Sequence, residues 1–338
     1  MIVKVYPRIR VTNTELSFQT LDAPPPPLFF VGNRPPEPLG IVTNVTKFWQ
    51  GVDIYWAFTK NFTAVGGAGY SFLTPFQDKE TNETGMNFLM AVRMPNMLPD
   101  QVFAFYQPLF DALAEIGIEM QNPTPVSPIN WGPARSGNGQ KPGNSRFSTR
   151  LIPASNWENR TLFLETTKAI RATAEAGYTF HGVSITPDEK SAGYPANKVP
   201  NAVNPAFRHT RMHADVFDYN NYGTDAAKID AAHKRLDGYM NALRAVTPDG
   251  GAYLNEADML EPNWQQSFFG NNYARLLKIK KSYDPWNVFW APTTVGSEGW
   301  AVQNKEGWPT QNGKLCRVDG KPEGKGKGKG KGKKKRWD

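Results

Sequence analysis

The chain has 338 residues, 39% hydrophobic and 12% aromatic, which is enough to form the core of one large or two ordinary domains. Its net charge is +8, but residues 321–338 hold nine Lys or Arg against two acidic residues, so the rest of the chain is nearly neutral and unlike a nucleic-acid-binding surface. No apolar run reaches the about 20 residues of a membrane helix, and the first residues lack the length and cleavage site of a signal peptide. We therefore expect no membrane partner, and the localisation stays open.

Strand-like and helix-like patterns follow one another irregularly along the chain. Strands are predicted over residues 2–11, 70–73, 86–93, 178–185 and 206–219, and helices over 47–64, 101–115, 156–176 and 224–246, with Asp100 and Asn156 as caps of the second and third helix. Short links such as that between residues 73 and 88 favour antiparallel pairing. The sequence thus predicts an α+β fold, an antiparallel sheet with helices packed on one face.

Several stretches are predicted to lie outside this core. Residues 122–144 and 187–204 are rich in Pro, Gly, Ser and Asn and read as loops, the first of which either roofs a pocket or lies free on the surface. Residues 66–69 are glycine-rich, but they follow a helix and enter a strand, the reverse of a dinucleotide-binding loop. The Gly/Lys repeat of residues 321–338 predicts a disordered tail.

The strand predicted over residues 206–219 carries polar side chains at every second position: His209, Arg211, His213 and Asp215. His213 and Asp215 are candidates for the lining of a substrate pocket, and a solvated polar face is the alternative. A metal site is not predicted, because two histidines four residues apart on a strand are separated by roughly 13 Å and no third ligand is evident nearby.

The densest stretch begins at Gly250. Residues 252–255 are predicted to form a short strand that places Tyr253 and Asn255 on one face. A helix follows that Asn263 caps and that Asp284-Pro285 ends. A phenol beside an amide can grip and deprotonate a hydroxyl group. A buried Tyr and Asn bonded to loops is the alternative interpretation.

This stretch resembles the C-terminal signature of the berberine bridge enzyme-like, FAD-linked oxidases. The matching positions are Tyr253-x-Asn255, Phe268-Phe269-Gly270-x-Asn272-Tyr273, Lys280, Tyr283-Asp284-Pro285 and Val288-Phe289. Residues 295–300 and Gly313-x-Leu315-Cys316-Arg317 resemble the fungal branch, which includes sugar and alcohol oxidases. The match upstream is looser and continues to the start of the chain.

The resemblance implies an oxidase that moves a hydride from an alcohol or carbohydrate to FAD and then to molecular oxygen. Carried over by position, Tyr253 would take part in proton abstraction, Asn255 would orient substrate or flavin, and Asn272 and Tyr273 would lie beside the flavin. Because the phenol has a pKa near 10, a neighbouring cation such as Arg211 would have to lower it. Many members of the family are secreted.

The resemblance also implies domain boundaries. Residues 1–20 would be the last strand of an N-terminal flavin-binding lobe, 21–249 the substrate-binding domain, 250–320 the berberine-like segment that returns to the flavin lobe, and 321–338 the tail. Because most of the flavin lobe has no counterpart here, FAD binding by this chain alone is expected to be poor and the chain to be inactive alone. Two alternatives remain: a non-catalytic ligand-binding remnant, and a polyanion or nucleic-acid binder that acts through the basic tail.

Overall fold

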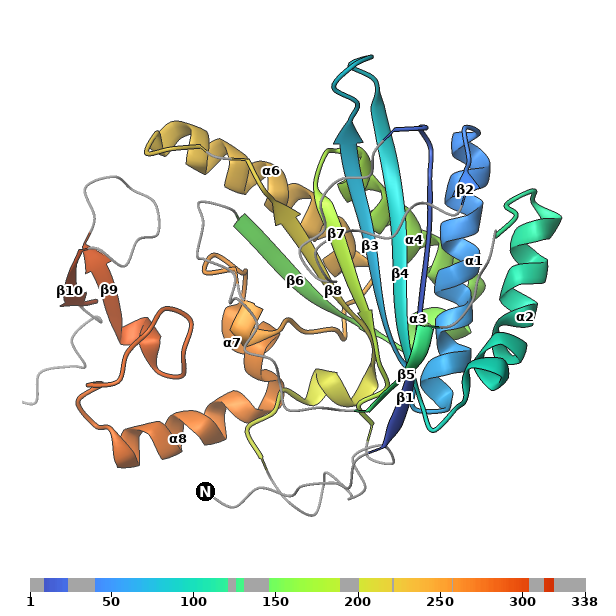
Figure 1. The fold of residues 1–338 in the computed structure, drawn as a ribbon. Coiled ribbons are helices and arrows are strands. Elements are labelled where there is room, and N and C mark those ends of the chain that lie inside the picture. The colour runs from blue at the N-terminus through green and yellow to red at the C-terminus, as the bar shows by residue number, and fades with distance from the viewer. Residues whose placement is uncertain are drawn as a thin grey trace, which may run out of the picture.

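A computed structural model of the chain describes residues 9–23, 40–120, 126–130, 146–188, 201–220, 222–256, 258–303 and 313–318 (Figure 1). The strands are β1 (Arg10–Gln19), β2 (Gly40–Ile41), β3 (Ala68–Gln77), β4 (Thr84–Pro95), β5 (Val126–Asn130), β6 (Arg146–Pro153), β7 (Thr179–Ser184), β8 (Thr210–Asp218), β9 (Trp300–Gln303) and β10 (Lys314–Arg317). The helices are α1 (Val45–Ala64), α2 (Pro99–Glu115), α3 (Ser155–Glu158), α4 (Arg160–Glu175), α6 (Ala226–Ala245), α7 (Trp264–Phe269) and α8 (Tyr273–Tyr283), with 3-10 turns η1 (Pro205–His209), η2 (Leu254–Glu256), η3 (Gly270–Asn272) and η4 (Ser297–Gly299).

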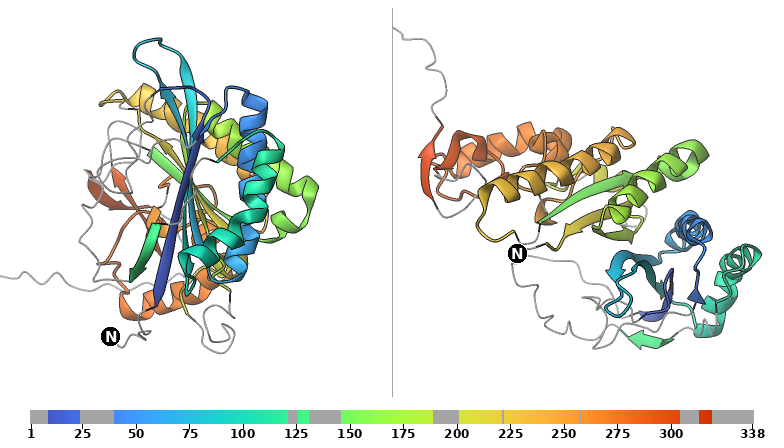
Figure 2. Two further views of the ribbon diagram at one scale, coloured as in Figure 1. Left: turned by 45° about the vertical axis from the view of Figure 1, so that its right-hand side comes forward. Right: turned by 90° about the horizontal axis from the view of Figure 1, so that it is seen from above.

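The fold is built on one large sheet in the order β2-β1-β4-β3-β7-β8-β6, with β5 paired to β1. All its pairings are antiparallel except that of β1 with β2. Seen along the sheet, α1, α2 and α4 lie on one side of it and the C-terminal elements on the other (Figure 2). The predicted α+β architecture is confirmed.

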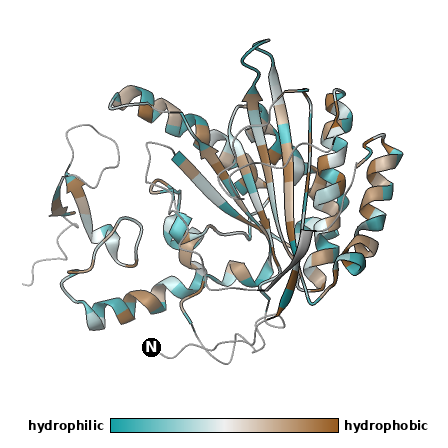
Figure 3. Ribbon diagram, in the orientation of Figure 1, coloured by the Kyte–Doolittle hydropathy of each residue, from teal (hydrophilic) through white to brown (hydrophobic). Residues whose placement is uncertain are grey.

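The helix-covered face of the sheet holds the main hydrophobic core. Phe88 of β4 contributes a fully buried ring that meets those of Phe18 on β1 and of Tyr55 and Trp56 on α1. Helix α6 joins the same core through Leu236, Met240 and Leu243. The hydropathy colouring follows this pattern, with apolar and polar residues alternating along the strands (Figure 3).

Several predicted boundaries need correction. The strand predicted from residue 206 begins at Thr210, because residues 205–209 form the turn η1, so His209 is not on the strand. Asn159, not Asn156, caps α4, and Leu98 rather than Asp100 precedes α2. Strand β5 lies inside the stretch predicted as a long loop. The strand start and the two helix caps are thus shifted along the chain, whereas β5 was not predicted at all.

The C-terminal segment differs most from expectation. Residues 252–255 are not a strand: after a single bridge from Gly251 to Leu151 the chain enters the 3-10 turn η2. Nor does one helix follow Asn263, since Gly270, the first residue of η3, has a φ of 52° and ends α7. A positive φ is a conformation that glycine adopts at low cost, so the chain bends there.

Three further observations complete the fold. β1 is hydrogen-bonded to β4 along its length and so belongs to the same sheet as β3 and β7. β1 lies within residues 1–20, the stretch predicted to be the last strand of a flavin-binding lobe. No helix among the described residues is long and apolar enough to cross a membrane. The tail predicted over residues 321–338 and most of the two predicted loops lie outside the described residues. The domain boundaries at residues 20, 249 and 320 stay predictions.

Candidate functional site

The face of the sheet opposite the helices carries polar and aromatic side chains in lateral rows. One row runs from Leu89 on β4 through Phe72 on β3, His181 on β7 and Asp215 on β8 to Thr149 on β6, as the strand registers show. The neighbouring row holds Tyr70 and His213. We call this surface the open face, and the candidate site is built on its β7, β8 and β6 part.

Tyr253 is fixed over the open face by both its backbone and its ring. Its N–H donates to Thr149 Oγ1 on β6 at 3.1 Å, and its ring meets those of His213 and Phe207 edge-on, with centroids 5.3 and 5.4 Å away. Asn255 Nδ2 donates to the Tyr253 hydroxyl at 2.8 Å. The phenol and the amide are therefore in contact, as expected from their spacing, although a tight turn rather than a strand brings them together.

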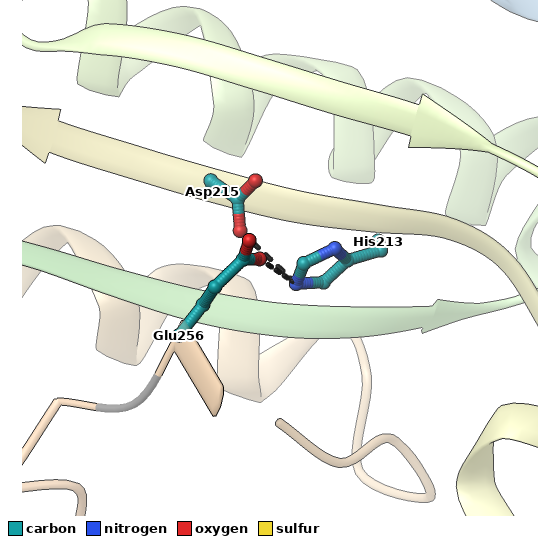
Figure 4. Close-up of side chains that lie close together, drawn as sticks. All are labelled: His213, Asp215 and Glu256. Atoms are coloured by element: carbon teal, nitrogen blue, oxygen red, sulfur yellow. Dashed lines mark ion pairs between the residues drawn. The ribbon is translucent and has the colours of Figure 1, made fainter. Parts of the chain in front are cut away.

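Three ionisable side chains converge on one another (Figure 4), and one of them, His213, contacts the Tyr253 ring. His213 Nε2 lies 3.0 Å from Asp215 Oδ1 and 3.4 Å from Glu256 Oε2. His213 and Asp215 are 6% and 2% exposed, whereas Glu256 in turn η2 is half-buried. Both approaches have ion-pair distances, and neither has the alignment of a hydrogen bond at His213 Nε2. We call these three residues the charged cluster.

A second histidine supports the charged cluster from the side of β7. His181 Nδ1 lies 2.9 Å from Asp215 Oδ2, so the two oxygens of Asp215 face different imidazoles. The His181 ring stacks on Phe72 with centroids 4.3 Å apart and planes within 5°. Packing on the ring and the contact with Asp215 fix its orientation.

The electrostatics of the charged cluster follow from burial and from neighbouring charges. For Asp215, burial raises the pKa, but contacts with His181 and His213 outweigh it and leave the pKa below the usual value. For His213, burial lowers the pKa, but the two carboxylates raise it by more, so that the net shift is upward. Burial and the charge of Asp215 raise the pKa of Glu256. The shifts favour a proton on His213 or Glu256 over one on Asp215.

The other predicted residues lie elsewhere. Asn272 donates to the Val203 carbonyl at 2.8 Å, and the Tyr273 hydroxyl donates to Glu298 at 2.7 Å. Their expected place beside a flavin stays a prediction. Arg211 donates to Thr63 and Thr186, and the titratable neighbour of the Tyr253 ring is His213 rather than Arg211.

Sequence reasoning missed two members of this site. Glu256 directly follows the Tyr-x-Asn motif, so the sequence does place it next to Tyr253 and Asn255. Its approach to His213 depends on the turn η2, which the sequence did not predict. His181 lies at an alternate position of a predicted strand, and the β7–β8 register that sets it opposite Asp215 joins residues 34 apart. Long-range pairing of this kind has no local signal.

Comparisons with known proteins match this description. The family model for berberine and berberine-like proteins matches residues 252–296, the stretch that contains Tyr253, Asn255 and Glu256. Residues 252–296 thus form a berberine-like segment, and the chain is similar over most of its length to fungal FAD-linked oxidoreductases. An FAD-linked oxidoreductase of Aspergillus clavatus is 27% identical over 95% of this chain and 50% of its own length. A VAO-type flavoprotein oxidase of Thermothelomyces thermophilus is 33% identical over 80% of this chain and 45% of its own length.

Solved structures of the family share the fold. A VAO-type flavoprotein from Myceliophthora thermophila C1 superposes with a TM-score of 0.66 at 26% identity, covering 92% of this chain and 50% of that protein. A chitooligosaccharide oxidase, at 16% identity and a TM-score of 0.50, is similar in fold over 85% of this chain and 55% of its own. The chain thus spans about half the length of the relatives it matches.

Proposed function

We propose that this chain provides the substrate-binding half of an FAD-linked oxidase that acts on the hydroxyl group of an alcohol or carbohydrate. The observation that carries the proposal is the convergence of Tyr253 and the charged cluster on the open face, within the segment that matches the berberine-like family model. Several relatives are FAD-linked, and when bound FAD supplies the acceptor for the hydride and the route to oxygen.

In this proposal the residues of this chain bind the hydroxyl and take its proton. The Tyr253 hydroxyl already accepts a hydrogen bond from Asn255, so its own proton remains available to a substrate oxygen. The substrate proton passes to His213 or Glu256, whose Nε2 and Oε2 lie 3.4 Å apart, with the His213 ring against that of Tyr253. Asp215 holds His213 in place and stabilises the proton there.

The residues of this chain fit one part of the cofactor only. The open face offers polar and aromatic groups to a planar ring. In the dinucleotide-binding fold, a glycine-rich turn from a strand into a helix holds the pyrophosphate. Gly67 and Gly69 instead follow α1 and enter β3, and a Cβ at either would collide with Phe62. These glycines serve helix-to-strand packing, so we expect FAD to need the other half of the relatives' length.

The surface of the C-terminal segment favours such an arrangement. Four large hydrophobic residues that lie close together in the sequence are largely exposed. Their exposed fractions are 87% for Tyr283, 74% for Trp286, 73% for Val288 and 80% for Phe289. The turn that presents them is well fixed, since Asp284 accepts from the backbone of Val288 and Phe289 and pairs with Lys280. A rigid apolar surface of this kind is typical of an interface. We propose that the flavin-binding half docks there.

A chimaera tests the proposed function. The full chain is joined to the N-terminal half of the Thermothelomyces thermophilus oxidase, and flavin absorbance is recorded before and after anaerobic addition of primary alcohols and of sugars. We expect retention of flavin, bleaching by at least one substrate and peroxide formation in air. The N-terminal half without this chain is the control. Retained flavin that no alcohol or sugar bleaches would favour a non-catalytic ligand-binding protein.

A further inference from the structure

The charged cluster has a geometry that a proton alone does not require. Its three ligand atoms, one imidazole nitrogen and two carboxylate oxygens, all lie within 4.8 Å of one another. They come from two separate parts of the chain, the β8 strand and the turn η2. The distances from His213 Nε2 to the two oxygens are 3.0 and 3.4 Å. A tetrahedral zinc ion with bonds of about 2.0–2.1 Å holds its ligand atoms about 3.3 Å apart.

The burial of the charged cluster also favours a bound metal ion. His213 Nε2 and Asp215 Oδ1 are buried atoms without a well-aligned hydrogen bond, in side chains that are more than nine-tenths buried, and both point toward Glu256 (Figure 4). The 3.0 Å approach between these two atoms satisfies them in part, and a cation bound between them would satisfy both. Two carboxylates near each other also repel, and a divalent cation between them would offset that repulsion.

The surroundings resemble the outer shell of a metal centre. His181 contacts Asp215 Oδ2, the oxygen turned away from His213, which leaves Oδ1 for a cation. Metal-ligating carboxylates are commonly held by such outer contacts. The half-buried Glu256 leaves one side of the cluster open to solvent, where a water molecule or a substrate oxygen can complete the coordination.

We propose that His213, Asp215 and Glu256 form a binding site for a divalent first-row transition-metal ion such as Zn²⁺. The ligand set of one imidazole and two carboxylates suits zinc and its neighbours, whereas Mg²⁺ and Ca²⁺ prefer oxygen ligands throughout. The proposal departs from the expectation that the chain has no metal site, which rested on the spacing of His209 and His213 and on the lack of an evident third ligand nearby. A bound cation occupies the groups that would accept the substrate proton, so metal binding and the proposed oxidase activity exclude each other.

The test measures zinc binding directly and needs no flavin. The full-length chain is freed of metal with a chelator and titrated with ZnCl2, and separately with MgCl2, by calorimetry at about pH 7.5. We expect one zinc ion per chain and at least tenfold weaker binding of magnesium. His213→Gln and Glu256→Gln each weaken zinc binding at least tenfold, while His209→Gln and Glu80→Gln, exposed matched controls, leave it unchanged. Circular dichroism verifies the fold of each variant.

Other results would overturn the inference. Absence of zinc binding at millimolar concentration in the folded wild-type chain contradicts it, as does binding that survives both His213→Gln and Glu256→Gln. Loss of zinc binding in Cys316→Ser would show that zinc is held at the lone thiol, and this result would also contradict the proposed site. Because the titration contains no flavin, the zinc measurement stands even if the chimaera has no oxidase activity. An active chimaera whose chain does not bind zinc would support the proposed function and contradict the zinc site.

Discussion

The two faces of the main sheet use the same strands for opposite purposes. On the helix-covered face, buried rings such as Phe88 and Phe180 pack against Trp56 of α1. On the open face, the intervening residues His181, His213 and Asp215 are also buried but are ionisable. Successive side chains of a strand point to opposite faces of the sheet. Neighbouring residues can therefore belong one to the core that stabilises the fold and the other to the charged groups proposed to act on a substrate. The difference predicts that substitutions on the two faces fail in different ways.

The largest loss of stability is expected on the covered face. Phe88→Ala removes a fully buried ring that contacts Phe18, Tyr55 and Trp56 and should lower the free energy of unfolding by about 3–5 kcal/mol. Urea denaturation followed by circular dichroism measures it. A loss below about 1 kcal/mol would mean that the covered face is not the principal core.

A second substitution tests how the C-terminal segment is attached to the sheet domain. Arg244 on α6 lies 2.7 Å from Glu261, whose side chain is 1% exposed. Arg244→Ala leaves that carboxylate buried beside few partners and should cost about 3 kcal/mol. As a control, Lys234→Ala breaks the exposed ion pair between Lys234 and Asp230 and should cost less than about 1 kcal/mol. Equal effects in urea denaturation would refute a special role for the Arg244–Glu261 pair.

On the open face the expected effect is a change in titration. Asp215→Asn removes the charge that contacts both imidazoles, so the pKa of His213 should fall, which NMR of its ring proton can follow in chelator-treated protein. A raised histidine pKa adds stability below the unfolded-state pKa and loses it as the pH rises through the folded-state pKa. The stability advantage of wild type over Asp215→Asn should therefore be larger near pH 5.5 than near pH 8.5. An unchanged His213 titration would contradict the proposed coupling.

The smallest effect on stability is expected at the apolar surface of the C-terminal segment. Phe289 has the same side chain as Phe88 but is 80% exposed, so Phe289→Ala should change the free energy of unfolding by less than about 0.5 kcal/mol. The same change should weaken binding to a separately produced flavin-binding half, measured by calorimetry. Unchanged binding would remove this surface from the proposed interface.

Much of the fold could be predicted from the sequence, because local patterns determine it. The helix over residues 47–64 and the strands over 86–93 and 178–185 carry clear periodicity and appear as α1, β4 and β7. The segment after Gly250 could not be predicted in the same way, since contacts with Thr149 and Leu151 override the strand pattern of residues 252–255. Tertiary contacts decide short segments more often than long ones.

The candidate site divides along the same line. Tyr253, Asn255, His213 and Asp215 stand out by residue type and spacing within single segments. Glu256 and His181 enter through contacts between β7, β8 and the turn η2, which no local pattern reveals. The catalytic and pocket roles assigned to the first four remain predictions until activity is measured.

The most direct test of the central proposal compares flavin reduction in chimaeras that differ by one side chain. Stopped-flow absorbance under anaerobic, chelator-treated conditions gives the rate with the best substrate for wild type, His213→Gln and Glu256→Gln, with His209→Gln and Glu80→Gln as controls. The account predicts a loss on the order of 100-fold in the first two variants and wild-type rates in the controls. Fully flavinylated His213→Gln and Glu256→Gln chimaeras that reduce flavin at the wild-type rate would contradict it.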